Sequence, residues 1–168
     1  MIPKKIEKAL NEQINQEFYS AYMYLSMASF LDRMNLQGFS NWMKVQFEEE
    51  QFHAMKLYDY VLERGGEVKL KEIERPPHKW KDIIDVFEAT KKHEEEVTKM
   101  INNLVDIAIQ EKDHATVNFL QWFVDEQVEE EASVDELLSQ LKLIGGRGSG
   151  LFILDREAKQ RSFVPPQN

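Results

Sequence analysis

The chain has 168 residues, 42% of them hydrophobic, which suits one domain with a single apolar core. Asp and Glu outnumber Lys and Arg by 30 to 21, and the net charge of -9 disfavours nucleic acid and anionic membranes as partners. Cysteine is absent, which excludes disulfides, thiolate zinc sites and iron–sulfur clusters. The sequence shows neither a signal-peptide core nor an apolar segment long enough to span a bilayer, so we expect a cytoplasmic protein.

Two helical patterns open the chain. The first covers about residues 3–34, with Pro3 at its start, where a helix needs no N–H donor. A short turn at residues 35–38 leads to the second, at about residues 39–64. Gly65–Gly66 is expected to end it, because glycine adopts left-handed backbone conformations at little cost.

A long connection at about residues 67–81 follows, and its Pro76–Pro77 pair cannot lie inside a helix. Extended at roughly 3.3 Å per residue, it is long enough to run the whole length of a neighbouring helix. A third pattern begins near Asp82, breaks at residues 112–113, and gives way to a fourth that ends near Ile144.

The order of these segments predicts an all-α fold. We expect a four-helix bundle over about residues 3–144, with one long crossover between two hairpins. A glycine-rich hinge at residues 145–150 precedes a short fifth helix at about residues 151–161. The tail, residues 162–168, is expected to fray, and the whole chain, 1–168, is expected to be one domain.

Ligand-type side chains interrupt the apolar stripe of every bundle helix, in phase with the buried face. In each hairpin they lie nearly equally far before and after the turn, so antiparallel packing brings them to the same level along the bundle axis. The long crossover then allows the level in one hairpin to match the level in the other. The residues are Glu17, Glu50, His53, Glu94, Gln127 and Glu130.

Four carboxylates at one level of an apolar core need compensation, because an unpaired buried charge costs several kcal/mol. No Lys or Arg shares these inward positions, so bound cations are the expected partners. Oxygen ligands with one imidazole suit iron or manganese. The spacing of Glu50 and His53 places both on one helix face, within reach of a single ion.

Three stretches resemble the helices of the prokaryotic non-haem ferritins, members of the ferritin-like superfamily: Asn15–Tyr22, Phe47–Ala54 and Trp122–Glu131. The resemblance covers nearly the whole chain, including the crossover and the short fifth helix. It implies a ferritin-like four-helix bundle and a cage of twenty-four subunits. It also implies two iron ions inside each bundle.

Residue roles follow from the resemblance. It implies that Glu17, Glu50 and His53 bind one iron, with Glu50 bridging to the other. It implies that Glu94 and Glu130 bind the second iron, with Gln127 beside it.

A third iron site is also implied, at Glu49, Glu126, Glu129 and Glu130. On the residues alone, the alternative for the first three is a solvated acidic face. The family places a tyrosine near the irons as an electron donor, and this position corresponds to Tyr24. Core packing is the alternative for Tyr24, and Trp122 is a second aromatic candidate.

Related families fit less well. Haem is not expected, because Gln51 stands where bacterioferritins carry their haem-binding methionine, and Met43 and Met55 read as core residues. Rubrerythrins need cysteines, and the DNA-binding miniature ferritins lack this set of ligands within the bundle. The remaining histidines, His78, His93 and His114, are expected on loop or outer-face positions in contact with solvent.

The expected function is that of a ferroxidase and iron store. Fe(II) would be oxidised by dioxygen or hydrogen peroxide and kept as ferric mineral inside the cage. One alternative is a di-iron or di-manganese peroxidase or oxygenase without storage. Another is a cage subunit without its own oxidation site, which would lack the ligands present here.

Overall fold

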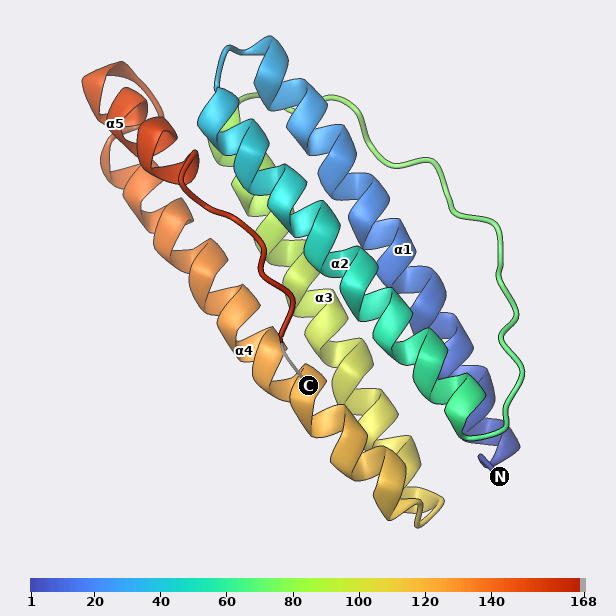
Figure 1. The fold of residues 1–168 in the computed structure, drawn as a ribbon. Coiled ribbons are helices and arrows are strands. Elements are labelled where there is room, and N and C mark those ends of the chain that lie inside the picture. Colours follow the sequence, from blue (N-terminus) through green and yellow to red (C-terminus); the bar gives the residue numbers. More distant parts are fainter. Residues whose placement is uncertain (167–168) are drawn as a thin grey trace.

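The computed structural model describes residues 1–166, and these form an all-helical molecule (Figure 1). Four long helices lie side by side as a bundle, and a short fifth helix crosses one end of it. The predicted fold, a ferritin-like bundle with a long crossover and a short C-terminal helix, is confirmed. The helices are α1 Lys4–Arg33, α2 Gln37–Glu63, α3 Ile83–Gln110, α4 His114–Leu143 and α5 Gly148–Ala158.

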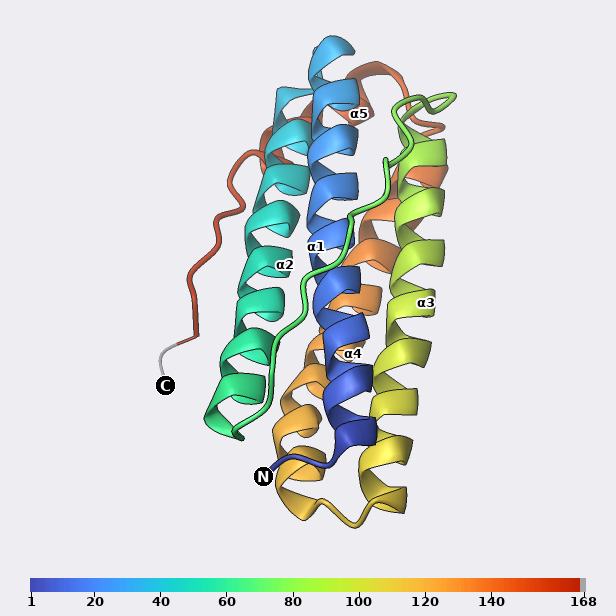
Figure 2. The same cartoon turned by 90° about the vertical axis from the view of Figure 1, so that its right-hand side faces the viewer.

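Two helical hairpins build the bundle: α1 packs mostly on α2, and α3 mostly on α4. The segment between α2 and α3 runs along α1 from one end of the bundle to the other (Figure 2). Asn11 fixes its start, because its side-chain amide donates to Glu67 O at 2.9 Å and its side-chain oxygen accepts from Lys69 N at 2.6 Å. Near the other end, Ser26 Oγ donates to Pro77 O at 2.6 Å. These bonds hold the crossover to α1 near both of its ends.

Local chemistry sets the ends of the helices. Asp82 caps α3 by accepting from Asp85 N at 2.9 Å, and Asp113 caps α4 through Thr116. Gly65 has a φ of +69° just after α2, as expected of a glycine that ends a helix. Across residues 1–166, no helix has the length and apolar character needed to cross a membrane.

Two helices begin earlier than their sequence patterns suggest. α2 starts at Gln37, so Gly38 lies in its first turn and not in the preceding loop. A carboxylate oxygen of Asp155, on α5, accepts from Phe39 N at 3.0 Å and satisfies one of the free donors of that turn. α5 starts at Gly148, inside the expected hinge, and a Cβ added at Gly150 in its first turn would lie 2.9 Å from Ile144 Cγ2.

The buried apolar side chains of the described chain form two clusters. One contains Leu31, Phe39 and Phe87, and the other contains Leu10 and Leu57. The buried ligand-type residues lie between them. Met43 is in the core as expected, but the expectation for Met55 is wrong: it is 42% exposed on the surface of α2.

The segment after α5 does not project freely. It turns back and runs along the face formed by α2 and α4 (Figure 1). Asn41 of α2 donates to Arg161 O at 3.0 Å and holds this segment to the helix. Gln167 and Asn168, the last residues of the expected frayed tail, lie outside the described residues.

Candidate metal centre

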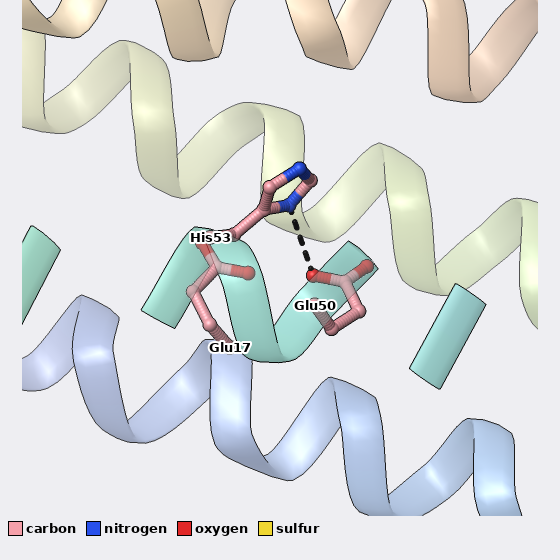
Figure 3. Close-up of side chains that lie close together, drawn as sticks. All are labelled: Glu17, Glu50 and His53. Carbon is pink, nitrogen blue, oxygen red and sulfur yellow. Dashed lines mark hydrogen bonds and ion pairs between the residues drawn. The ribbon is translucent and has the colours of Figure 1, made fainter. Parts of the chain in front are cut away.

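Glu17 of α1 faces Glu50 and His53 of α2 in the middle of the bundle (Figure 3). The side chains are 1%, 2% and 3% exposed, and one ligand atom from each lies within 4.8 Å of the others. His53 Nδ1 lies 3.2 Å from Glu50 Oε2, one helical turn apart. Two carboxylates and an imidazole at this spacing can hold one metal ion.

The second hairpin contributes Glu94 from α3 and Glu130 from α4, 0% and 6% exposed. Gln127 Nε2 donates to Glu94 Oε2 at 3.2 Å, and the Tyr24 hydroxyl donates to Glu94 Oε1. Among the described residues, Glu94 and Glu130 stand outside the tight group of Glu17, Glu50 and His53. They lie close enough for their charges to act on Glu50.

The protonation of these carboxyls reflects burial and mutual repulsion. Burial raises the pKa of Glu50 well above its usual value, and the charges of Glu17, Glu94 and Glu130 raise it further. Burial and the charge of Glu130 raise the pKa of Glu94 to about 8, despite hydrogen bonds from Tyr24 and Gln127 that lower it. Without a cation, the centre therefore retains protons at neutral pH.

Two observations indicate that this centre is suited to binding a metal ion. Glu17 Oε2 is buried and makes no hydrogen bond within the described part of the chain. The same part of the chain offers Glu17, Glu50, Glu94 and Glu130 no ion pair with lysine or arginine; their only ion-pair partner is His53, with Glu50. Multivalent cations would give Glu17 Oε2 a partner and would supply the positive charge that the buried carboxylates need.

The acidic residues of the implied third site spread from this centre towards the surface. Glu126 Oε2 lies 3.9 Å from His53 Nε2, on the side of the ring opposite Glu50. Glu49 Oε2 is held by Arg161 Nη2 at 2.7 Å, and burial raises the pKa of Glu49 to about 7. Glu129 is exposed, and Val128 beside it is 67% exposed. The structure therefore sets Glu49 and Glu126 next to the centre and Glu129 at the surface.

Amide side chains that the sequence analysis did not single out support the carboxylates. Gln13 Nε2 donates to Glu17 Oε1 at 2.7 Å, and Gln46 Nε2 donates to Glu130 Oε2 at 2.9 Å. Both amides are almost fully buried, at 1% and 0% exposure. The available signal was their spacing, since Gln13 precedes Glu17 and Gln46 precedes Glu50 by one helical turn on the same face.

Tyr24 is fully buried, and its pKa is raised by burial and by the charges of Glu94, Glu50 and Glu130. The expectation that His93 is solvated is wrong. Its Nε2 lies 2.7 Å from Ser20 Oγ, its ring meets Tyr24 edge-on at 6.1 Å, and burial lowers its pKa to about 4. Its place beside Glu94, at the edge of the buried face, explains the difference. His78 and His114 are exposed, as expected.

Comparison with known proteins settles the family. The sequence profile described as ferritin-like domain matches residues 7–144. The bacterial non-heme ferritin of Campylobacter jejuni is 43% identical, over 95% of each chain. The chain belongs to the ferritin family. The resemblance stated from the sequence is thereby confirmed.

Other ferritins agree with this placement. The bacterial non-heme ferritin of Staphylococcus aureus is 37% identical over 97% of this chain and 98% of its own. A closed form of the Archaeoglobus fulgidus ferritin, engineered by site-directed mutagenesis, is 54% identical and superimposes with a TM-score of 0.96 over 98% of this chain and 100% of its own. The open-pore ferritin of the same organism superimposes with a TM-score of 0.95 over 96% of this chain and 100% of its own, also at 54% identity.

Proposed function

We propose that this ferritin oxidises Fe(II) to Fe(III) at the buried centre and stores the ferric product as a mineral inside a cage. One observation carries the proposal: four buried carboxylates and an imidazole meet between the apolar clusters without a Lys or Arg partner in the described chain. Such an arrangement is costly unless cations occupy it. Family membership identifies iron as the cation that fits.

The ligand roles are part of the proposal. Glu17, Glu50 and His53 bind one Fe(II), and their geometry supports this assignment. Glu94 and Glu130 bind a second, with Gln127 beside it, and Glu50 bridges the two ions. Two iron ions per subunit give up two electrons together, which suits the reduction of hydrogen peroxide or the first step in the reduction of dioxygen. Anionic oxygen ligands favour the higher charge of Fe(III) and so help oxidation.

Further residues complete the proposed route. Glu49, Glu126 and Glu129, together with Glu130, form a third, transient iron site between the centre and the surface. Tyr24 is proposed as an electron donor, because its hydroxyl donates directly to a carboxylate of the centre, Glu94.

The proposed assembly follows the family. We propose that the whole chain, residues 1–168, forms one domain and associates with copies of itself into a cytoplasmic cage of twenty-four subunits. Packing of α5 against α2 supports treating α5 and the bundle as one unit. The mineral would lie inside the cage, and the centre would deliver Fe(III) to it.

Stopped-flow oxidation of Fe(II) tests the proposed site. Metal-free parent, Glu50→Ala and Glu48→Ala proteins are mixed with two Fe(II) per chain in air, and the ferric absorbance is followed. Glu48 is the matched control, because it is an exposed glutamate on the same helix. We expect Glu50→Ala to lose the fast phase and Glu48→Ala to keep it. An unchanged fast phase in Glu50→Ala would contradict the proposed site.

A further inference from the structure

The segment that follows α5 is attached to the surface of α2. Asn41 Nδ2 donates to the carbonyl oxygens of Ala158 and Lys159, both at 3.4 Å, and to that of Arg161 at 3.0 Å. Further along, Phe163 packs on Phe52, with ring centroids 5.8 Å apart. The segment therefore follows α2 from the depth of Asn41 to that of Phe52.

Arg161 is the residue of this segment that reaches inward. Its Nη2 lies 2.7 Å from Glu49 Oε2, its Nη1 donates to Trp42 O at 3.5 Å, and its guanidinium lies 4.3 Å from the centre of the Trp42 ring. The side chains of Arg161 and Glu49 are only 23% and 19% exposed, so solvent screens their ion pair less than one on the surface.

Glu49 lies next to the metal centre. It precedes Glu50 in α2, and the charges of Glu130 and Glu126 act on it directly. The aromatic ring that Phe163 covers belongs to the wall of the same centre: Phe52 packs on Trp122 at 5.9 Å, and Trp122 packs on His53 at 5.4 Å. The segment after α5 thus covers the side of the centre where Glu49 and Glu126 approach the surface.

We propose that Arg161 is a positioning residue of the metal centre: it pairs with the Glu49 carboxylate as a resident counter-ion, and a metal ion that binds Glu49 has to compete with it. This inference rests on the proposed function, because it concerns the passage of cations out of the same centre. Arg161 would lower the affinity of Glu49 for metal ions, so that an ion leaving the buried centre binds there only briefly and is then released.

The physical basis is competition for the charge of one carboxylate. The guanidinium of Arg161 pairs with Glu49 through Oε2, so a metal ion that binds this carboxylate competes with a positive charge that the chain itself places there. Stacking on Trp42 orients the group in advance, which reduces the entropy it loses on pairing. Removing the arginine leaves a carboxylate that is partly buried among other acidic groups and has no cation, so its affinity for a metal ion rises.

Equilibrium dialysis of metal-free cages against Zn²⁺, which undergoes no redox chemistry, tests the proposal. The variants are Arg161→Gln, Arg161→Lys and Glu49→Gln. Lys99→Gln is the control, because it removes the same charge from an exposed ion pair on α3. We expect the parent to fill the buried centre first and the Glu49 position at higher Zn²⁺ concentration. In Arg161→Gln that last step should move to about tenfold lower concentration, and in Arg161→Lys by less, because lysine keeps the charge but loses the guanidinium stacking on Trp42.

Three results would overturn the proposal. In Arg161→Gln, the Zn²⁺ concentration at which the Glu49 position fills could stay within about twofold of that in the parent. Glu49→Gln could leave that step in place, which would show that Glu49 binds no cation. Arg161→Gln and Arg161→Lys could shift it equally, which would assign the effect to packing on Trp42 and not to charge. Failure of the proposed function would be seen in different measurements. Glu50→Ala would then keep the first Zn²⁺ binding step and the fast phase of Fe(II) oxidation.

Discussion

Protons and metal ions compete for the same oxygens at the centre. Burial and neighbouring charges raise the pKa values of Glu50 and Glu94, so the metal-free protein retains protons there that a cation would release. The bundle thus holds the carboxylates in place, and their charge is compensated by protons in the metal-free protein and by a metal ion in the loaded protein.

This competition predicts opposite pH dependences for metal-free and metal-loaded protein. The pKa of Glu94 is about 8 in the folded chain and 4.5 as an ordinary glutamate. Between these values the folded state binds more protons than the unfolded state, so the free energy of unfolding falls as pH rises. With saturating Zn²⁺, deprotonation favours binding, and stability should rise instead.

Thermal unfolding midpoints between about pH 5 and pH 8, with a chelator or with Zn²⁺, check this prediction. Comparison with Glu94→Gln isolates the contribution of that carboxyl from those of surface groups. A parent and a Glu94→Gln variant with the same pH slope in chelator would contradict it.

The buried amides make a second prediction at this scale. Gln46 donates to Glu130 across the interface of α2 and α4. We expect Gln46→Leu to weaken Zn²⁺ binding about tenfold while the fold is kept, because groups that orient a metal ligand contribute to its affinity. Gln51→Leu, at an exposed position of α2, should bind Zn²⁺ as the parent does. Equal affinities for both variants would show that Gln46 has no orienting role.

Among the helices, α5 depends on the close approach of its backbone to α2. A Cβ added at Gly38 would lie 1.6 Å from the carbonyl oxygen of Asp155 and 2.5 Å from the carbonyl carbon. Both atoms belong to the backbone, so no rotation of a side chain can relieve the contact. A glycine is therefore required in the first turn of α2 for α5 to dock.

We expect Gly38→Ala to lower the stability by about 1–3 kcal/mol and to loosen α5, because overpacked contacts force the backbone to move. Alanine would otherwise stabilise a helix by up to about 1 kcal/mol relative to glycine. Chemical denaturation and limited proteolysis after α4 measure the two effects. Asp155→Ala, which removes only the acceptor for Phe39 N, should have a smaller effect. A Gly38→Ala variant more stable than the parent would rule out the close contact.

The helices themselves could be predicted because period, proline and glycine are local signals. The start of α2 could not, since Gly38 lies in its first turn against the backbone of Asp155, a residue distant in the chain. The position of the last segment depends likewise on Arg161 meeting Glu49, which no local pattern encodes.

For the whole molecule, in-phase polar residues at matched depth were enough to predict that six ligand-type side chains are buried in the core, but not that the amides Gln13 and Gln46 join them. The sequence could not predict how tightly they gather. Glu17, Glu50 and His53 form a close group, whereas Glu94 and Glu130 stand apart and bind to Gln127, Tyr24 and Gln46. These distances depend on how the two hairpins pack, a tertiary property of the bundle.

Iron retention tests the central claim most directly. Metal-free protein is loaded with Fe(II) in air, well beyond two ions per chain, and iron and protein are then measured together across a size-exclusion column. We predict that the iron stays soluble and elutes with a very large particle. If no more than two ions per chain are retained in a small oligomer and the rest precipitates, the storage function is wrong and the protein is a di-iron redox enzyme.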